Sequence, residues 1–277
     1  MNWANTRLLL TGASGGIGTA FATALHKRGA SLLLVDIDYD ALEKVATALG
    51  PAARVELMRA DLTDPSGRTT LISRAATWRT NVIINNAGIC RFGWLADQTD
   101  HDVAATLAIN TEAPLALCLG LLPHLMQQPE AHIVNLGSVF GSIGYPGYAV
   151  YSASKFAIRG FTEALRRELV DTSVAVHYLA PRATRTGINN DTVVRMNRAL
   201  GVAMDTPEMV AEALCRLLDN NEKQRTVGFP EKLFVRLNGL IPGVVDRALR
   251  KQLPIIKRHA RFGTSREHTT NMKEMTS

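Results

Sequence analysis

Short apolar runs and longer amphipathic stretches alternate along the first 228 residues of the chain. The run RLLLTG at 7–12 indicates a short buried strand that ends at a glycine turn, and the stretch at 17–29 places apolar residues at helical spacing. The same alternation continues beyond them. We expect strands at 7–12, 31–36, 54–61, 81–88, 132–138, 174–181 and 225–228, and helices at 17–29, 39–50, 64–76, 100–127, 151–171 and 206–219.

Most of these runs are apolar on both faces, which is typical of parallel strands that are covered by helices on two sides. The pattern therefore predicts an α/β fold with a doubly wound parallel sheet of about seven strands and helices on both faces. Residues 1–228 contain no linker, repeat or low-complexity segment, so we expect them to form one domain. Residues 182–204 follow no readable pattern, and we expect a loop there that shapes a pocket.

The chain after residue 228 has a different pattern. Pro242 suits a helix start, and Pro254 is expected to end that helix. We expect a basic amphipathic extension at 229–263 and, because two Met are the only apolar residues that follow, a disordered tail at 264–277. One face of the expected helix would carry Val244, Val245, Ala248 and Leu249, and the other Asp246, Arg247, Arg250 and Lys251.

The net charge of +6 lies entirely in this extension and tail. Residues 229–277 hold 10 Lys+Arg and 4 Asp+Glu, whereas residues 1–228 hold 21 of each. A uniformly basic nucleic-acid-binding protein would not be divided in this way, so we expect no nucleic-acid partner. The basic helix can pack as a lid over a substrate cleft or lie on an anionic membrane surface, and a lipid-like substrate would suit both roles. The lid is the favoured interpretation.

A glycine-rich turn, TGASGGIG, joins the first expected strand to the first expected helix. Gly12, Gly16 and Gly18 let the backbone turn tightly and approach a pyrophosphate, which rests on the helix N-terminus. A tight turn without a ligand needs fewer glycines. The position of this turn in the first strand–helix–strand unit therefore indicates a dinucleotide site.

Asp36 ends the second expected strand, 18 residues after Gly18. A carboxylate at this position can accept hydrogen bonds from both ribose hydroxyls of an adenosine, and it would repel a 2′-phosphate. Ile37 and Asp38 follow, so neither next residue supplies a cation to neutralise that phosphate. The sequence therefore favours NAD over NADP. The alternative role for Asp36, capping the next helix, can be filled by Asp38.

The pentapeptide YSASK places Tyr151 and Lys155 four residues apart, which is one helical turn. An ammonium beside a phenol favours the phenolate and lowers the phenol pKa toward the neutral range. The pair can therefore transfer a proton, although a surface tyrosine and lysine on an ordinary helix would show the same spacing.

Further motifs complete a set: RADL with Asp61, NNAG at 85–88, LAIN with Asn110 and NLGS with Ser138. Together with TGASGGIG and YSASK, in this order and spacing, they resemble the short-chain dehydrogenase/reductase family, in its ordinary single-domain branch. The resemblance covers about residues 5–228. It implies a Rossmann-type fold and an NAD(P)-dependent oxidoreductase that interconverts an alcohol and a ketone or aldehyde by hydride transfer.

The resemblance also implies roles for individual residues. Tyr151 would be the general acid/base, Lys155 would lower its pKa and hold the nicotinamide ribose, and Ser138 would orient the substrate oxygen. Asn110 would bind a water that links Lys155 to solvent, although it could instead only kink its helix, and Ser138 could instead only cap a strand end. The implied cofactor-binding residues are Gly12, Ser14, Gly16, Ile17, Gly18, Asp36, Asp61, Leu62, Asn86, Ala87, Gly88, Tyr151, Lys155, Pro181 and Thr186.

One position departs from the family pattern. The family usually shows PGxxxT after the sixth strand, and this chain has PRATRT from Pro181 to Thr186, with Arg182 in place of the glycine. The arginine could recognise an acidic group of the substrate, or it could point to solvent.

The remaining features bound the function. Three distant cysteines and scattered histidines predict no disulfide and no metal site, and the N-terminus does not resemble a signal peptide, so we expect a cytoplasmic protein, peripheral to a membrane if the extension binds lipid. The resemblance implies a homo-oligomer that pairs through the helices at 100–127 and 151–171, with Ala113, Leu117, Ala157 and Phe161 on the exposed faces. Two other functions remain open: a redox-sensing regulator that binds the dinucleotide, and a membrane-surface protein without turnover.

Overall fold

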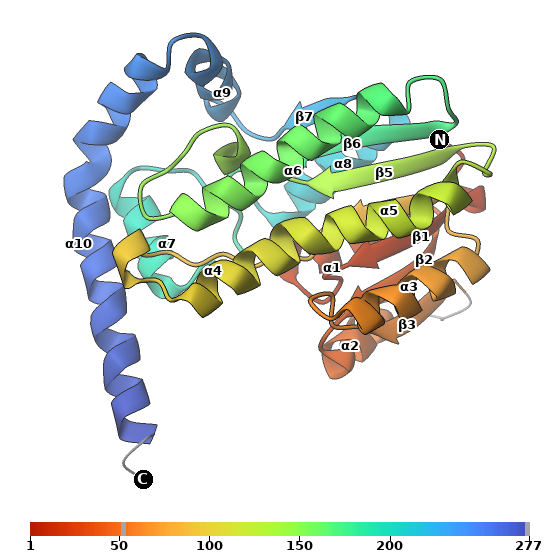
Figure 1. Ribbon diagram of the computed structural model, residues 1–277, viewed down its shortest axis with the longest axis horizontal. Coiled ribbons are helices and arrows are strands. Elements are labelled where there is room, and N and C mark those ends of the chain that lie inside the picture. The colour runs from red at the N-terminus through yellow and green to blue at the C-terminus, as the bar shows by residue number, and fades with distance from the viewer. Residues whose placement is uncertain (51–53, 275–277) are drawn as a thin grey trace.

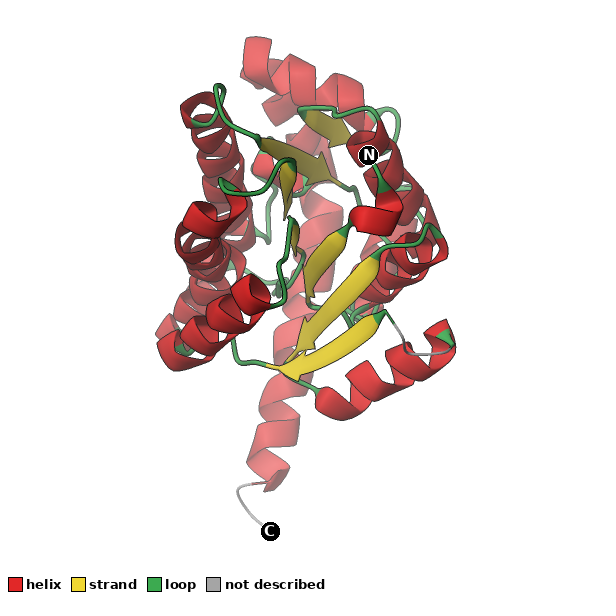
Figure 2. Ribbon diagram, turned by 90° about the vertical axis from the view of Figure 1, so that its right-hand side faces the viewer, coloured by secondary structure: helices red, strands yellow, loops and turns green. Residues whose placement is uncertain are grey.

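The computed structural model describes residues 1–50 and 54–274, with the backbone alone for residues 261–274. Seven parallel strands form one sheet in the order β3-β2-β1-β4-β5-β6-β7. Figures 1 and 2 show this sheet between two layers of helices. The strands are β1 Arg7–Thr11, β2 Ser31–Asp36, β3 Val55–Arg59, β4 Val82–Asn85, β5 Ala131–Leu136, β6 Val174–Ala180 and β7 Gln224–Thr226. The α-helices are α1 Gly16–Lys27, α2 Tyr39–Leu49, α3 Pro65–Thr77, α4 Asp100–Leu107, α5 Ala113–Leu125, α6 Ala149–Glu168, α7 Asp191–Ala199, α8 Pro207–Asp219, α9 Glu231–Leu240 and α10 Pro242–Glu274.

The doubly apolar strands explain the two layers. Leu8 and Leu10 of β1 face the core that α1, α2 and α8 cover, whereas Leu9 faces the core that α3, α5 and α6 cover. Successive side chains of a strand point to opposite faces, so a run of leucines supplies both cores at once. The predicted α/β fold, a doubly wound parallel sheet of seven strands, is confirmed.

Helix starts follow the sequence signals closely. Asp64 caps α3 by accepting hydrogen bonds from the backbone of Ser66 and Gly67, with Pro65 as the first helical residue. Asp38 caps α2 by accepting from the backbone N–H of Ala41, 3.0 Å away, which leaves Asp36 free for another role. Short polar side chains at these positions bond the N–H groups that the first turn leaves unpaired.

The helix expected at 100–127 is divided. A π-helical segment, Ala108–Glu112, separates α4 from α5 and contains Asn110, which is 1% exposed. The combined stretch Asp100–Leu125 is the one helix in the described part of the chain that is long and apolar enough to cross a membrane by length and composition. It packs against α3 and α6 and carries core residues on its inner face, as expected for a helix that covers a sheet.

Two helices were not predicted. Helix α7 lies in the segment expected to be a loop, although Asn190 caps it and Val193, Met196 and Asn197 are buried at helical spacing. Both signals were present in the sequence. Helix α9 precedes the expected tail helix and has no buried residue among those described. No core-facing side of this helix could therefore be recognised in the sequence.

The tail departs from prediction in its length. Helix α10 continues past Pro254 to Glu274, so the expected helix end at Pro254 is wrong. A proline inside a helix costs about 3 kcal/mol, but Ile256 and Ala260 beyond it are 0% and 2% exposed, and their burial offsets this cost. The helical backbone to residue 274 also differs from the disordered tail expected at 264–277, whose side chains and last three residues lie outside the described part.

The inward face of α10 also differs from the expected one. Val245 is buried and Leu249 half-buried, as predicted, whereas Val244 and Ala248 are exposed. The predicted faces of the pairing helices need a similar correction, because Ala113 and Leu117 are 0% and 1% exposed and belong to the core. Both errors arise because a pattern of apolar residues does not say which part of an apolar face a neighbouring element covers.

Candidate active site

A cavity of about 880 Å³ lies at the carboxyl ends of the strands. In the sheet, β2 and β3 lie on one side of β1, and β4 lies on its other side. The strand order therefore reverses at β1, and the connections that leave the sheet in opposite directions open a crevice there. Every residue expected to bind the dinucleotide lines this cavity, together with Ser138. Asn110 is the one expected site residue that does not line it. Its side chain lies behind the wall.

The glycine-rich turn forms the floor of one end. Gly12 has φ +64°, and a Cβ on Gly18 would lie 2.0 Å from the carbonyl oxygen of Gly12, so the turn closes only with glycines at these positions. A Cβ on Gly16 would lie 2.8 Å from Cγ2 of Thr186. The turn after β1 and the segment after β6 therefore meet at Gly16 with no side chain between them.

The carboxylate of Asp36 faces the same turn. Its Oδ2 accepts a hydrogen bond from the backbone N–H of Ser14, at 3.0 Å, and its Oδ1 accepts one from the N–H of Ile37, at 2.8 Å. Asp61 lies farther along this wall, where Thr63 donates to its Oδ1 through both backbone and side chain and lowers the pKa of the carboxyl. The end of the cavity nearest β2 and β3 is therefore acidic.

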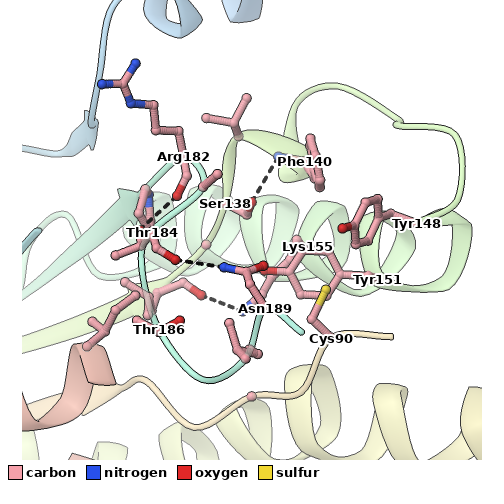
Figure 3. A pocket seen from close by; sticks show the side chains of 18 of the residues that line it. Cys90, Ser138, Phe140, Tyr148, Tyr151, Lys155, Arg182, Thr184, Thr186 and Asn189 are labelled. Atoms are coloured by element: carbon pink, nitrogen blue, oxygen red, sulfur yellow. Dashed lines mark hydrogen bonds between the residues drawn. The ribbon is translucent and has the colours of Figure 1, made fainter. Parts of the chain in front are cut away.

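Two hydrogen bonds with the Tyr178 side chain fix the backbone of Ser138. The Tyr178 hydroxyl accepts from the backbone N–H of Ser138 at 3.4 Å and donates to its carbonyl oxygen at 3.3 Å. A Cβ on Gly137 would lie 2.1 Å from the Tyr178 ring, so glycine is needed beside the serine. The Ser138 hydroxyl also accepts a hydrogen bond from the N–H of Phe140 (Figure 3), so it caps the start of the 3-10 helix Val139–Gly141 and not, as the alternative had it, the end of a strand.

Tyr151 and Lys155 project from one face of α6 into the cavity beside Ser138 (Figure 3). The Lys155 Nζ donates to the carbonyl oxygen of Leu136 at 2.9 Å and lies 5.8 Å from the centre of the Tyr151 ring. Burial lowers the pKa of Lys155 to about 8, with the Cys90 thiol opposing the change. Burial also raises the pKa of Tyr151; Cys90 adds to the increase, and a hydrogen bond with Ser138 opposes it.

These directions differ from the expected lowering of the Tyr151 pKa by Lys155. Desolvation is the largest cause of the increase, and the Lys155 ammonium, 5.8 Å from the ring centre, does not reverse it. The phenol is therefore held protonated at neutral pH. That state suits a proton donor to a carbonyl more directly than a proton acceptor from an alcohol.

Asn110 joins two walls of the site. Its Oδ1 accepts from the N–H of Ile89 at 2.8 Å, and its Nδ2 donates to the Ile89 carbonyl at 2.9 Å and to the Ser154 hydroxyl at 3.1 Å. Gly88 makes this possible, because a Cβ there would lie 3.0 Å from the Asn110 oxygen and 3.7 Å from Lys155 Nζ. The π-helical segment thus places an amide between the loop after β4 and α6.

The side chain of Arg182 forms ion pairs instead of pointing freely to solvent. Its guanidinium points away from Tyr151 (Figure 3) and pairs with Asp205 at 2.6 Å and with Glu231 at 3.0 Å. It also donates to the carbonyl oxygen of Phe229. Asp205 is 1% exposed, so the arginine neutralises a buried carboxylate and connects the segment after β6 to the start of α9. The expectation that it points freely to solvent is wrong, because its side chain is 13% exposed, whereas recognition of an acidic substrate group stays a prediction.

Several lining residues were missed from the sequence. Phe140, Tyr145, Tyr148 and Tyr151 form a cluster with ring centres 4.8 to 6.4 Å apart. Cys90 lies beside Tyr151 (Figure 3), and burial raises its pKa to about 12. Tyr145 donates a hydrogen bond to Gln252 of α10. No local sequence motif marks these residues, because only the folded chain brings the segments at 90, 140–151 and 252 together.

The cavity therefore has two unlike ends that meet at Ser138 and Tyr151. One end is glycine-lined and acidic, and the other is aromatic and is covered by Phe234, Val245, Ala248 and Leu249 of α9 and α10. At the junction, the hydroxyl of Thr186 is buried and has no hydrogen-bond partner among the described residues. A polar group of a bound molecule would satisfy it, so these residues fit a dinucleotide that spans from Asp36 to Thr186.

Comparison with known proteins agrees with this geometry. The family model for short chain dehydrogenases matches residues 6–196. The putative oxidoreductase SadH of Mycobacterium tuberculosis is 31% identical over 245 residues, covering 81% of this chain and 86% of its own. The chain belongs to the short-chain dehydrogenase/reductase family, whose members are oxidoreductases with an NAD(P)-binding fold.

Two solved structures extend the comparison. A short-chain dehydrogenase/reductase from Burkholderia phymatum, in complex with NAD, has a TM-score of 0.79 at 24% identity and covers 86% of this chain and 94% of its own. A short-chain dehydrogenase from Sphingobium yanoikuyae, in complex with NADPH, has a TM-score of 0.75 at 28% identity and covers 87% and 95%. The first likeness concerns the fold alone, and the two relatives were solved with different dinucleotides.

Proposed function

We propose that this protein interconverts a neutral, apolar alcohol and its ketone or aldehyde, with NAD as the hydride carrier. The observation that supports this most directly is the placement of Ser138, Tyr151 and Lys155 where the glycine-lined and aromatic ends of one cavity meet. A substrate oxygen near Ser138 and Tyr151 would leave its carbon facing the glycine-lined end. When bound there, the dinucleotide supplies or accepts the hydride.

In this mechanism Tyr151 passes a proton to the carbonyl oxygen during reduction and takes it back during oxidation. Ser138 holds the oxygen by a hydrogen bond, and Tyr178 fixes the backbone on which Ser138 is carried. Lys155 stabilises the phenolate while it exists. Asn110 positions the loop at Ile89 and α6 together, and a water at its helical backbone would extend the proton path to solvent.

NAD is the proposed cofactor because Asp36 faces the turn that would carry the adenosine ribose. Its two oxygens could accept hydrogen bonds from both ribose hydroxyls, and a 2′-phosphate would meet a carboxylate. Gly12, Ser14, Gly16, Ile17 and Gly18 would hold the pyrophosphate. Asp61 and Leu62 would contact the adenine. Asn86, Ala87 and Gly88 would line the central part of the cofactor cleft. The nicotinamide end would be held by Pro181, Thr186, Tyr151 and Lys155.

The substrate class follows from the aromatic end. Tyr148 and Phe140 give it an apolar wall, and α9 and α10 close over it. The single arginine among the described lining residues, Arg182, already pairs with Asp205 and Glu231, which balances its charge before a substrate binds and disfavours an acidic substrate. Its Nε is buried without a hydrogen-bond partner among the described residues. A bulky or lipid-like neutral substrate fits this environment, with the α9–α10 segment as its lid.

The wider assignments follow the same proposal. We expect a homo-oligomer, a small-molecule substrate rather than nucleic acid, and a cytoplasmic location, peripheral to a membrane only if the basic extension binds lipid. A domain at 1–228, an extension at 229–263 and a tail at 264–277 remain the proposed division. A regulator without turnover is disfavoured, because Ser138, Tyr151 and Lys155 are all present at the junction.

The test is substitution of Tyr151 by Phe. We expect Tyr151→Phe to lower kcat by about 10²–10⁴-fold, because the general acid/base is lost, while NADH still binds at the glycine-lined end. Tyr148→Phe is the matched control, since it removes a phenol from the same aromatic cluster and should keep most of kcat. Turnover would be measured on a graded set of apolar alcohols and ketones. A Tyr151→Phe protein with near-parental kcat would disprove the mechanism.

A further inference from the structure

Helix α9 and the start of α10 expose an unusual number of apolar side chains. The described chain has 17 large apolar residues with exposed side chains, and six of them fall within residues 229–244. Helix α9 itself has no buried residue in the described structure. We call these six the corner surface: Phe229, Leu233, Phe234, Leu240, Ile241 and Val244, which are 77%, 49%, 39%, 81%, 54% and 47% exposed.

The corner surface lies at the edge of the molecule. Figure 1 shows α9 and the first turns of α10 standing away from the sheet, at the opposite side from β3. Leu240 and Ile241 sit at the bend between the two helices, where the chain turns from α9 into α10. Single exposed apolar residues are common on protein surfaces, but a contiguous group indicates an interaction site.

Exposed basic side chains lie on the same two helices as most of these apolar ones. Lys232 and Arg236 of α9 and Arg247, Arg250 and Lys251 of α10 are exposed. Within the described residues, none of the five forms a salt bridge with an acidic group. On the acidic side, Asp246 is exposed, and Glu231 is already paired with Arg182. Helix α9 and the start of α10 thus expose apolar and positive side chains along the same stretch of chain.

We propose that the corner surface docks on an anionic lipid bilayer. Apolar side chains at an interfacial helix enter the boundary between headgroups and acyl chains, and Lys and Arg around them attract anionic headgroups. A second copy of this chain is a poorer occupant, because two identical positive surfaces would repel each other across the contact. Residues 1–228 are neutral, and residues 229–251, which include the corner surface, hold 5 Lys+Arg and 2 Asp+Glu, so this segment would attract a negative membrane.

Docking in this orientation would bring the substrate cavity to the bilayer. Phe229 and Phe234 belong to the corner surface and also line the cavity, and Val245 and Leu249 continue from it along α10. A long-chain alcohol could then pass from the acyl layer into the aromatic end. This second step rests on the proposed function, whereas the docking itself does not.

Vesicle co-sedimentation tests the docking with the full-length protein. The probes are vesicles of phosphatidylcholine alone and of phosphatidylcholine mixed with phosphatidylserine, each at low and high salt. We expect binding to the mixed vesicles that weakens at high salt. Leu240→Glu combined with Ile241→Glu should lower the bound fraction at least about tenfold, and each of Arg247→Gln and Arg250→Gln should lower the partition about fivefold.

Val170→Glu is the matched control, because Val170 is 82% exposed and lies far along the sequence from the corner surface. It should bind vesicles as the parent does. Parent protein that stays in the supernatant with mixed vesicles overturns the proposal. A double variant that binds vesicles as well as the parent also overturns it. If the double variant changes only the molar mass in light scattering, the occupant of the corner surface is a second copy of the chain, and the proposal is again overturned.

Turnover separates the docking from the proposed function. A short, water-soluble alcohol should be oxidised equally by the parent and by the Leu240→Glu, Ile241→Glu variant, because neither residue lines the cavity. A long-chain alcohol supplied in mixed vesicles should lose kcat/KM in the variant. No turnover of any alcohol by either protein would contradict the enzyme assignment and leave the vesicle result to decide the docking.

Discussion

At the scale of single residues, Asp36 is positioned before any ligand binds. Hydrogen bonds from Ser14 and Ile37 hold its two oxygens toward the glycine-rich turn. We expect the parent to prefer NAD, and Asp36→Ala to reduce the preference for NAD over NADP about 100-fold through lost ribose contacts and lost charge repulsion. Comparison of kcat/KM with both dinucleotides measures this.

The matched control for that substitution is Asp38→Ala. It removes the side-chain cap of α2, so it should lower the free energy of unfolding by about 1 kcal/mol. The ratio of kcat/KM with NAD to kcat/KM with NADP should stay unchanged. A parent enzyme that prefers NADP, or an Asp38→Ala ratio that moves with Asp36→Ala, would contradict the assignment.

Lys155 gives a prediction about pH. Its pKa is lowered to about 8, so the side chain is charged below that pH and loses its charge as the pH rises through it. Because the ammonium is the proposed contact of the nicotinamide ribose, NADH affinity should be constant from pH 6 to about 7.5 and weaken above about pH 8. Titration of NADH fluorescence across this range is the measurement. Lys155→Met should bind weakly at every pH, and a parent-like pH profile in that variant would disprove the attribution.

The residues that could be predicted from the sequence are those that stand in a recognisable local motif, Ser138 and Asn110 among them. Tyr151 and Lys155 lie one helical turn apart, and the glycines around Ser14 form a single turn, so spacing alone places them together. Tyr178, Cys90 and Asp205 could not be found in this way. Each reaches the site from a distant segment, and only the order of strands in the sheet brings it there.

At the scale of elements, Arg182 connects the segment after β6 to the first turn of α9. Removing the arginine would leave Asp205 buried and unpaired, so the more selective change is Glu231→Gln, which weakens only the link to α9. This ion pair is mostly buried, and its loss should raise KM for bulky substrates about fivefold with little change in kcat or NADH affinity.

Steady-state kinetics on short and bulky alcohols checks that expectation. Glu212→Gln is the control, because Glu212 also pairs with an arginine but lies on the exposed face of α8 and does not line the cavity. A kcat that falls with KM unchanged, or equal effects on short and bulky substrates, would show that the link does not position α9 over the substrate.

The elements themselves were predictable where their residues face the sheet. Six of the seven strands and the helices that cover them follow from the apolar pattern, since burial against the sheet imposes it, whereas β7 consists of three polar residues and has no buried side chain. The helices above the cavity were harder. Helix α10 passes through Pro254 because Ile256 packs with Tyr148 and Met196, and a contact of this kind is invisible in a local sequence window.

At the scale of the whole molecule, the proposed dimer would use α5 and α6, which lie side by side on one face of the sheet (Figure 1). With Ala113 and Leu117 in the core and Phe161 half-buried, the outward apolar residues are Ala157, as predicted, together with Leu119 and Phe156, which are 77% and 43% exposed. We expect a dimer in light scattering at micromolar concentration, and Leu119→Glu with Phe156→Glu should shift it toward single chains.

Met209→Glu is the control for that measurement, because Met209 is 50% exposed on α8, on the other face of the sheet. It should leave the molar mass unchanged. A parent protein that is monomeric at this concentration would contradict the dimer, and a mass that falls only with Met209→Glu would move the contact to α8.

The long helix α10 over the cavity also affects which step limits the turnover rate. Val245 and Ile256 of α10 are 4% and 0% exposed, and each such side chain gains about 1.5–3 kcal/mol from burial. Lifting α10 exposes both, so the open form is rare. Departure of a bulky product would then be slower than the chemistry beneath the helix, and kcat would follow solvent viscosity rather than isotopic substitution of the transferred hydrogen.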